Sequence, residues 1–280
     1  MITIKEIIER KKYEVREMLK DRSLASYRGS AEFHKKQFRL RDFQGEITRE
    51  PGDKLFNLIA EIKRKSPSAG EIKPNADITE IAKIFNPLAS AISVLTDSAF
   101  LGELYHLNIV RQATDKPILR KDFIIHPAQI YQSRLAGADS LILMTHVLGN
   151  SKYNLKTNLT ECISIARSID LEPLVESHTI DELTFAEMAG AAIFGINNRN
   201  LITMETSLET TKLLADYIPK GLPIVIASGI KTRQDVESLY QNLKYAGCMP
   251  AGMLVGETLA RSENIQSKML ELLGKNYSSS

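Results

Sequence analysis

The sequence predicts an α/β fold, a (β/α)8 TIM barrel with an N-terminal helical extension. From residue 57 onward, eight short apolar runs recur about 20 to 35 residues apart, and helix-like segments separate most of them. Alternating strands and helices imply a parallel sheet with right-handed crossovers. Eight such units in about 225 residues match the length of a (β/α)8 barrel. The alternative is a doubly wound open sheet, but no G-x-G-x-x-G turn follows the first strand.

The expected strands are apolar throughout, as suits strands buried on both faces. They are Leu58–Ile62, Ala91–Leu95, Pro117–Leu119, Ser140–Met144, Pro173–Val175, Ala192–Ile196, Pro223–Ile226 and Met253–Val255. The expected helices between them cover residues 78–85, 128–136, 158–168, 179–189, 207–217 and 233–243.

Residues 1–50 are expected to form a helical extension that packs on the barrel of residues 51–275. Thr3-Ile4-Lys5-Glu6 has the pattern of a capping box, which predicts a helix through about Lys20. Its apolar side chains would cover a surface of the barrel, and short helices and loops are expected over residues 21–50. Because no linker rich in Gly, Pro or Ser separates the two parts, we expect a single domain overall. The apolar positions of the first helix are Ile4, Ile7, Ile8, Val15 and Leu19.

The charge balance indicates neither a nucleic-acid nor a membrane partner. Net charge is +2, and no apolar run approaches the roughly 18 residues that span a bilayer. The N-terminus has no signal-peptide core, so we expect a cytoplasmic protein. Residues 1–50 hold 13 Lys and Arg against 9 Asp and Glu, and we interpret this excess as a solvated helical face rather than a binding tail.

Cysteine and histidine usage predicts no metal site. The two cysteines, Cys162 and Cys248, have no metal-like spacing, and the five histidines are scattered along the chain. Few cysteines also fit a reducing compartment.

Polar side chains gather where the expected strands end. Glu61 and Lys63 are two residues apart at the end of the first strand, so their side chains point the same way. In (β/α)8 barrels the active site lies at these carboxyl ends. The alternative, a rim of structural salt bridges, is a poor way to build stability because burying ions costs desolvation. The other strand ends supply Ser93, Thr96, Asp97, Arg120, Lys121, Asp122, Glu176, Ser177, Asn197, Asn198, Arg199, Ser228, Gly229, Gly256 and Glu257.

This rim combines cations with carboxylates. Lys63, Lys121 and Arg199 supply positive charge, and Glu61 and Glu176 supply negative charge. Such a set can hold one group as a proton donor and another as an acceptor. We expect a lysine that is desolvated or crowded by cations to have a lowered pKa and to act as a general acid near neutrality.

Glycines after the last two strands indicate a phosphate site. Ser228-Gly229 follows the seventh strand and Gly256 the eighth. Loops at these places in barrels often bind phosphate through backbone N–H groups, and glycine allows a close approach. Lys65 and Ser66 follow the adjacent first strand, where Pro67 closes the charged stretch.

These segments resemble the indole-3-glycerol phosphate synthase family. The likeness extends in order from about residue 55 to 262, and the N-terminal extension fits as well. The matching motifs are Ile59-Ala-Glu-Ile-Lys-Arg-Lys-Ser-Pro-Ser68, Ile92-Ser-Val-Leu-Thr-Asp97, Pro117-Ile-Leu-Arg-Lys-Asp-Phe-Ile-Ile125, Gln129-Ile-Tyr131, Ala136-Gly-Ala-Asp139, Leu174-Val-Glu-Ser-His178, Gly195-Ile-Asn-Asn-Arg-Asn-Leu201 and Leu254-Val-Gly-Glu-Thr-Leu259.

The resemblance implies a carboxy-lyase of tryptophan biosynthesis. Its substrate would be 1-(2-carboxyphenylamino)-1-deoxyribulose 5-phosphate, a small phosphorylated molecule. Condensation, decarboxylation and dehydration would give indole-3-glycerol phosphate, with neither metal nor organic cofactor. We expect a monomer or a weak homo-oligomer.

The resemblance also implies roles for single residues. Lys121 would be the general acid that protonates the ketone oxygen, and Glu176 its acid or base partner in later steps. Lys63 would contact the anthranilate carboxylate and assist dehydration, with Glu61 orienting it. The expected substrate-binding residues are Asn197, Arg199, Phe123 and Ser93, and the expected phosphate-binding residues are Lys65, Ser66, Ser228, Gly229 and Gly256.

The chain departs from the family pattern in two places. Ala227 stands where the family usually has a glutamate, and the segment Phe100-Leu101-Gly102-Glu103 is one residue shorter than usual. These departures motivate an alternative, a catalytically weak or inactive paralogue that binds a phosphorylated ligand or a protein partner. A third interpretation, a phosphoribosylanthranilate isomerase, would need a Cys/Asp pair, but neither cysteine lies at an expected strand end.

Overall fold

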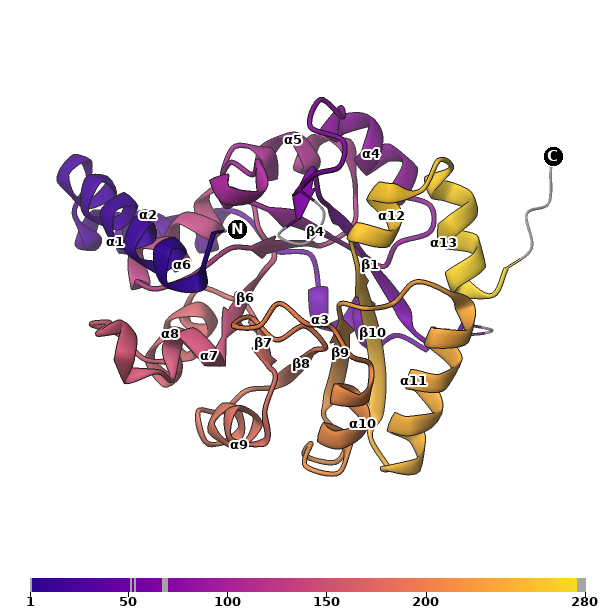
Figure 1. Ribbon diagram of the computed structural model, residues 1–280. Coiled ribbons are helices and arrows are strands. Elements are labelled where there is room, and N and C mark those ends of the chain that lie inside the picture. Colours follow the sequence, from indigo (N-terminus) through magenta and orange to yellow (C-terminus); the bar gives the residue numbers. More distant parts are fainter. Residues whose placement is uncertain (1, 51, 53, 67–69, 276–280) are drawn as a thin grey trace.

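A closed barrel of parallel strands forms the centre of the computed structural model, which describes residues 2–50, 52, 54–66 and 70–275. The strand order is β1-β10-β9-β8-β7-β6-β5-β4, and helices surround the barrel (Figure 1). The barrel closes because β1 pairs with both β10 and β4. The predicted (β/α)8 fold is therefore confirmed, and the open sheet is excluded.

All eight barrel strands overlap the predicted apolar runs. β10 begins at Met249 rather than Met253, and its pairing with β9 shifts register between Pro250 and Gly252. Such a bulge accommodates proline, which lacks an N–H for the ladder. The strands are β1 Asn57–Ile62, β4 Ala91–Leu95, β5 Ile118–Lys121, β6 Ser140–Met144, β7 Leu174–Ser177, β8 Ile193–Asn197, β9 Pro223–Ala227 and β10 Met249–Val255.

The two remaining strands, β2 Lys65–Ser66 and β3 Gly70–Glu71, form a short antiparallel hairpin that the sequence did not predict. Pro67 and Ser68, which belong to the quoted first-strand motif, lie outside the described residues.

Six of the outer helices agree with the sequence. They are α4 Ile78–Phe85, α6 Pro127–Leu135, α8 Leu159–Ser168, α9 Ile180–Met188, α10 Glu209–Ala215 and α11 Arg233–Tyr245. Four helices were not predicted: α5 His106–Ala113, α7 Thr145–Leu148, α12 Glu257–Arg261 and α13 Ile265–Leu273. α5 and α7 begin without a side-chain cap, so the usual start signal is missing from the sequence. Short 3-10 turns, η1 Ser98–Phe100 and η2 Ser151–Tyr153, complete the outer layer.

Three helices precede the barrel. The capping box of Thr3 and Glu6 starts α1, Ile4–Asp21, as predicted. α2, Leu24–Gln37, is longer than the short helices expected there, and it packs on α6 (Figure 1). α3, Phe43–Thr48, contacts β1 and β10.

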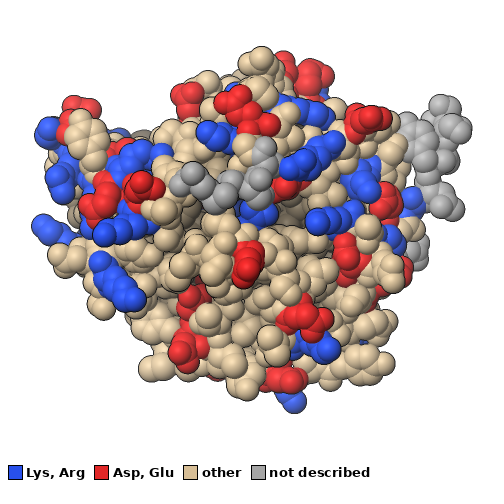
Figure 2. Space-filling model, viewed as in Figure 1, with Lys and Arg blue, Asp and Glu red and all other residues tan. Residues whose placement is uncertain are grey.

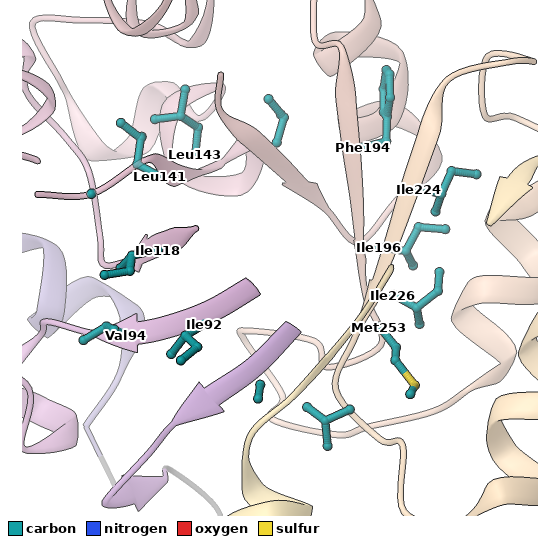
Figure 3. Packing of buried hydrophobic residues seen from close by; sticks show 14 of the residues in the cluster. Ile92, Val94, Ile118, Leu141, Leu143, Phe194, Ile196, Ile224, Ile226 and Met253 are labelled. Atoms are coloured by element: carbon teal, nitrogen blue, oxygen red, sulfur yellow. The ribbon is translucent and has the colours of Figure 1, made fainter. Parts of the chain in front are cut away.

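Apolar side chains form two layers, one outside the ring of strands and one inside it. The outer layer joins the strands to the surrounding helices, and Figure 3 shows part of it around the ring, from Ile92 and Val94 to Phe194 and Met253. The inner layer contains Ile59 of β1 and side chains of the other seven strands. This alternation follows from the two-residue period of a strand. It decides which polar residues face the inside of the barrel.

Charges of both signs are scattered over the face drawn in Figure 2, mostly in its upper half, where Lys and Arg side chains are interspersed with Asp and Glu. No helix among the described residues is both long and apolar enough to cross a bilayer.

Candidate active site

One layer of inward-facing side chains forms the floor of the site. Each lies two residues beyond an apolar residue of the inner layer, so it points inward at the carboxyl end of its strand. The charged members converge because the strands are parallel, so their carboxyl ends meet at one end of the closed barrel. The layer consists of Glu61, Ser93, Lys121, Met144, Glu176, Gly195, Ala227 and Gly256.

Lys121, Glu176 and Asn197 form one hydrogen-bonded group. The Lys121 Nζ lies 3.1 Å from Glu176 Oε2, and Asn197 Nδ2 donates to Glu176 Oε1 over 2.9 Å. Arg199 in turn donates its backbone N–H to Asn197 Oδ1. Both Glu176 oxygens thus have a partner, which fixes the carboxylate opposite the lysine.

The pKa of Lys121 is raised, contrary to the expectation that it would be lowered. Burial lowers the pKa of this ammonium, but the carboxylates of Glu176 and Glu61 outweigh burial and raise it. Arg199 opposes them only weakly. The sequence correctly indicated a nearby cation, but it did not reveal that the two carboxylates have the larger influence on this pKa. Lys121 therefore stays protonated near neutrality, which is the form that a general acid needs.

Glu61 and Lys63 form an ion pair, as their spacing predicted. Lys63 Nζ lies 2.6 Å from Glu61 Oε1, and Glu61 is only 1% exposed. Gly256 lies so close to this carboxylate that any side chain at position 256 would collide with it. A side chain there would force the buried Glu61 carboxylate to move, so glycine suits this contact.

A cavity at the ends of β9 and β10 contains the predicted phosphate residues Ser228, Gly229 and Gly256. Glu61, Lys63, Lys121 and Arg199 also line it. Ser228 and Gly229 both have a left-handed backbone, with φ values of 67° and 84°, so the chain turns sharply where it enters the cavity. The Asn198 amide holds this turn by donating to the Ser228 carbonyl oxygen over 3.1 Å.

An adjoining cavity is more apolar. Phe123 and Phe100 line it with their rings stacked at a centroid distance of 6.4 Å. Lys63, Lys121 and Glu176 line the same cavity, so the aromatic wall and the charged floor share one space. An aromatic ring bound against Phe123 would therefore lie beside the Lys121 ammonium.

Three predicted site residues do not line either cavity. Ser93 is fully buried beside Glu61 in the strand register. Lys65 and Ser66 belong to β2, and Ser66 is buried. Of the described residues, these three are not among those that line the two cavities.

The sequence missed Lys11 of α1, which is buried and not part of a solvated face. Its Nζ lies 2.9 Å from Asp97 Oδ2 and 2.8 Å from Asp122 Oδ1, at the ends of β4 and β5. The interpretation of the Lys and Arg excess in residues 1–50 as a solvated helical face was therefore wrong for Lys11. A signal was available, because Lys11 lies four residues from both Ile7 and Val15, on the apolar face of the helix.

A third cavity lies beside Glu176 and Asn197, and the sequence gave no indication of it. His146, His178 and Glu182 line it. His146 Nδ1 lies 3.0 Å from Glu182 Oε1, and His178 Nδ1 lies 2.7 Å from the Asn197 carbonyl oxygen. Within the described ranges, no group of three or more His, Cys, Asp or Glu is arranged to hold a metal ion.

Comparison with known proteins places this geometry in a family. A family model described as "Indole-3-glycerol phosphate synthase" matches residues 4–272. A curated protein of that name from Desulforamulus reducens is 38% identical over 276 residues, which is 96% of each chain. Another from Dehalococcoides mccartyi is 42% identical over 221 residues, covering 77% of this chain and 81% of the relative.

Solved structures with little sequence identity share the fold. A 3-hexulose-6-phosphate synthase from Salmonella typhimurium has a TM-score of 0.58 at 14% identity and covers 78% of this chain and 97% of its own. A mutant tryptophan synthase alpha-subunit from Pyrococcus furiosus has a TM-score of 0.55 at 14% identity, covering 78% and 98%. At this identity the likeness concerns the barrel alone.

Proposed function

This chain belongs to the indole-3-glycerol phosphate synthase family, and from that premise we propose how its barrel mouth closes the indole ring. The protein is an indole-3-glycerol phosphate synthase, a carboxy-lyase of tryptophan biosynthesis. It converts 1-(2-carboxyphenylamino)-1-deoxyribulose 5-phosphate by ring closure, loss of CO2 and loss of water. Nothing in the comparisons favours the alternative of a weak or inactive paralogue.

Lys121 is the general acid of this proposal. As the ring carbon attacks the ketone carbon, the ketone oxygen gains negative charge, and the Lys121 ammonium gives it a proton. The raised pKa of Lys121 supports this role because the donor is protonated before the substrate arrives. Glu176, 3.1 Å away, receives or returns a proton in the following steps.

Lys63 binds the carboxylate that leaves as CO2, and it assists the final loss of the hydroxyl group as water. This proposed role of Lys63 is supported by its position in the cavity that Lys121 and Phe123 also line. Glu61 orients Lys63 through their ion pair. Ser93 is the strand neighbour of Glu61, and its proposed role stays that of a substrate contact from the inner face of β4.

The remaining contacts divide between the two cavities. Phe123 packs on the aromatic ring, and Asn197 and Arg199 bind the hydroxyl and charged groups of the sugar chain. The proposed phosphate contacts are Ser228, Gly229 and Gly256, supported by their common cavity, and Lys65 and Ser66, supported by the family motif.

The observation that carries the proposal is that Lys121, Glu176, Asn197 and Phe123 line one cavity. The test is to incubate the purified protein with the substrate and to follow indole fluorescence. We expect product formation by the native protein and a large loss in Lys121→Met. Absence of product at high enzyme concentration would refute the proposal.

We further propose that residues 1–50 and the barrel form a single domain, supported by the ion pairs of Lys11. We also propose a cytoplasmic monomer or weak homo-oligomer. It would have no nucleic-acid or membrane partner, which the net charge of +2 supports. Size-exclusion chromatography over a range of concentrations tests the oligomeric state. A tightly associated oligomer at low concentration would contradict it.

A further inference from the structure

A buried ion network joins the N-terminal helix to the rim of the barrel. The Lys11 ammonium lies between two buried carboxylates, 2.9 Å from Asp97 Oδ2 and 2.8 Å from Asp122 Oδ1. Arg10 pairs with Asp97 but not with Asp122, and Arg120 pairs with Asp122 but not with Asp97. Arg10 and Lys11 each also pair with Glu14 of α1, whose side chain is 40% exposed. In the part of the chain that the structure describes, Lys11 is thus the cation whose ion pairs include both aspartates.

Each aspartate fixes a segment that faces the substrate cavity. Asp97 caps the turn η1 by accepting from the Ala99 N–H over 2.8 Å, and Phe100 ends that turn. Asp122 lies between Lys121 and Phe123 in the chain and accepts from the Phe123 N–H over 2.8 Å. The partners of Lys11 therefore stand next to the proposed acid and next to both aromatic side chains of the cavity wall.

A contribution to stability does not by itself explain why this ion network is buried. Burying three charges costs desolvation, and replacing such groups by apolar side chains is often neutral or stabilising. Ion pairs of good geometry, however, fix the positions of the groups that carry them. Burial raises the pKa of Asp122, but Arg120 and Lys11 outweigh it and hold the pKa well below its usual range, so this carboxylate remains charged.

We propose that Lys11 is a positioning residue for the synthase reaction. By bridging Asp97 and Asp122, it sets the separation of the β4 and β5 ends, and so aligns Lys121 and Phe123 with Phe100. This inference rests on the proposed function of Lys121. The N-terminal helix then contributes to catalysis without touching the substrate.

The first test compares Lys11→Met with Val15→Ala. Both residues are buried on α1, but Val15 is apolar and makes no ion pair with the rim. We expect Lys11→Met to lower kcat by about 10- to 100-fold, because small displacements of a catalytic group have effects of this size. We expect Val15→Ala to lower Tm but to leave kcat unchanged.

A second variant keeps the charge. Lys11→Arg still pairs the two aspartates and is expected to fold, but its larger head group moves the strand ends, giving a kcat between those of Lys11→Met and the native enzyme. Native kcat in a folded Lys11→Met would overturn the proposal. If Lys11→Met does not fold, native kcat in Lys11→Arg would overturn it.

A measurement without substrate separates this inference from the proposed function. In hydrogen exchange, Lys11→Met is expected to speed exchange in peptides covering residues 97–101 and 120–125 more than Val15→Ala does. If the native protein forms no product but this difference appears, the proposed function fails while the bridge by Lys11 stands. Equal exchange in the two variants would overturn the role of Lys11.

Discussion

The two ends of the barrel use the same eight strands for different purposes. At the amino end, Phe43 and Ile47 of α3 join the inner apolar layer, and Asn57 closes the contact by donating to the carbonyl oxygens of Ile47 and Arg49. At the carboxyl end, side chains such as Lys121 and Glu176 face the same interior. On β1, β5 and β7, the charged residue of the site lies two residues after an apolar residue of the inner layer. Stability and catalysis can therefore be altered separately.

The largest expected effect concerns the carboxyl end. Lys121→Met removes the proposed proton donor but keeps much of the side-chain volume. We expect kcat to fall by about 10² to 10⁴-fold, the range for loss of a general acid. Substrate affinity should change far less, because the proton moves only in the transition state. Single-turnover kinetics on the variant measure both quantities.

A matched variant, Lys63→Met, removes a charge from the same cavity. Its loss should include weaker binding of the carboxylated substrate, seen as a higher KM. An unchanged kcat in Lys121→Met would show that Lys121 is not the general acid. It would also contradict the proposal that the carboxyl end of the barrel serves catalysis and the amino end serves stability.

The second effect concerns the amino end. Ile47 is fully buried in α3, and Ile47→Ala leaves a cavity in the inner layer. We expect the free energy of unfolding to fall by about 2–5 kcal/mol, with kcat unchanged below the unfolding temperature. Chemical denaturation and initial rates on the same sample test this. A parallel loss of kcat in the folded variant would show that the two ends are coupled.

The third prediction concerns pH. The pKa of Lys121 is raised by Glu176 and Glu61 against the opposing effect of burial. A raised pKa in the folded state gives stability that is fully present below the unfolded pKa, roughly 10.4. That stability is lost as pH rises through the higher folded value. Deprotonation of Lys121 should therefore cause no fall in kcat/KM below about pH 10.

Rate profiles and Tm between pH 8 and pH 11 measure this dependence. Lys121→Met serves as the control, and its Tm should decline less over the same interval. An alkaline fall of kcat/KM near pH 8 that Lys121→Met abolishes would contradict the raised pKa.

The smallest effect is expected at Ala227. This residue lines the phosphate-side cavity together with Glu61, Lys63 and Lys121. In Ala227→Glu the new carboxylate meets cations that are already paired with Glu61 and Glu176. We expect kcat to change by less than about tenfold. A much larger gain in kcat would indicate that the native enzyme has lost activity through the change to alanine. The variant Ala227→Gln is the control, because it adds a side chain of the same size without the charge.

The fold was predictable because its signals are local. Apolar runs separated by helix patterns located all eight strands, and the two-residue period placed Glu61 and Lys63 on one face of the first strand. Boundaries were less certain. β10 begins before Pro250 because a register shift in its pairing with β9 accommodates the proline. No local sequence pattern predicts that shift.

The site was predictable in composition but not in detail. The sequence indicated which charges meet at the rim, but the pKa of Lys121 depends on distances to Glu176 and Glu61 that only the folded barrel sets. Lys11 was missed because its partners, Asp97 and Asp122, lie far away in the sequence. A lysine on an apolar helix face is the one local sign of such an arrangement.

The pairing of β1 with β10 also bears on how the protein is made. Asn57 and Gly252 are neighbours in the sheet, although the ribosome makes them about 200 residues apart. At roughly 5–20 residues per second, the first strand waits about 10–40 s for its last partner. During that time its edge is open to pairing with other chains. Glu61, near the carboxyl end of that strand, likewise meets Gly256 only after about 200 further residues have been made.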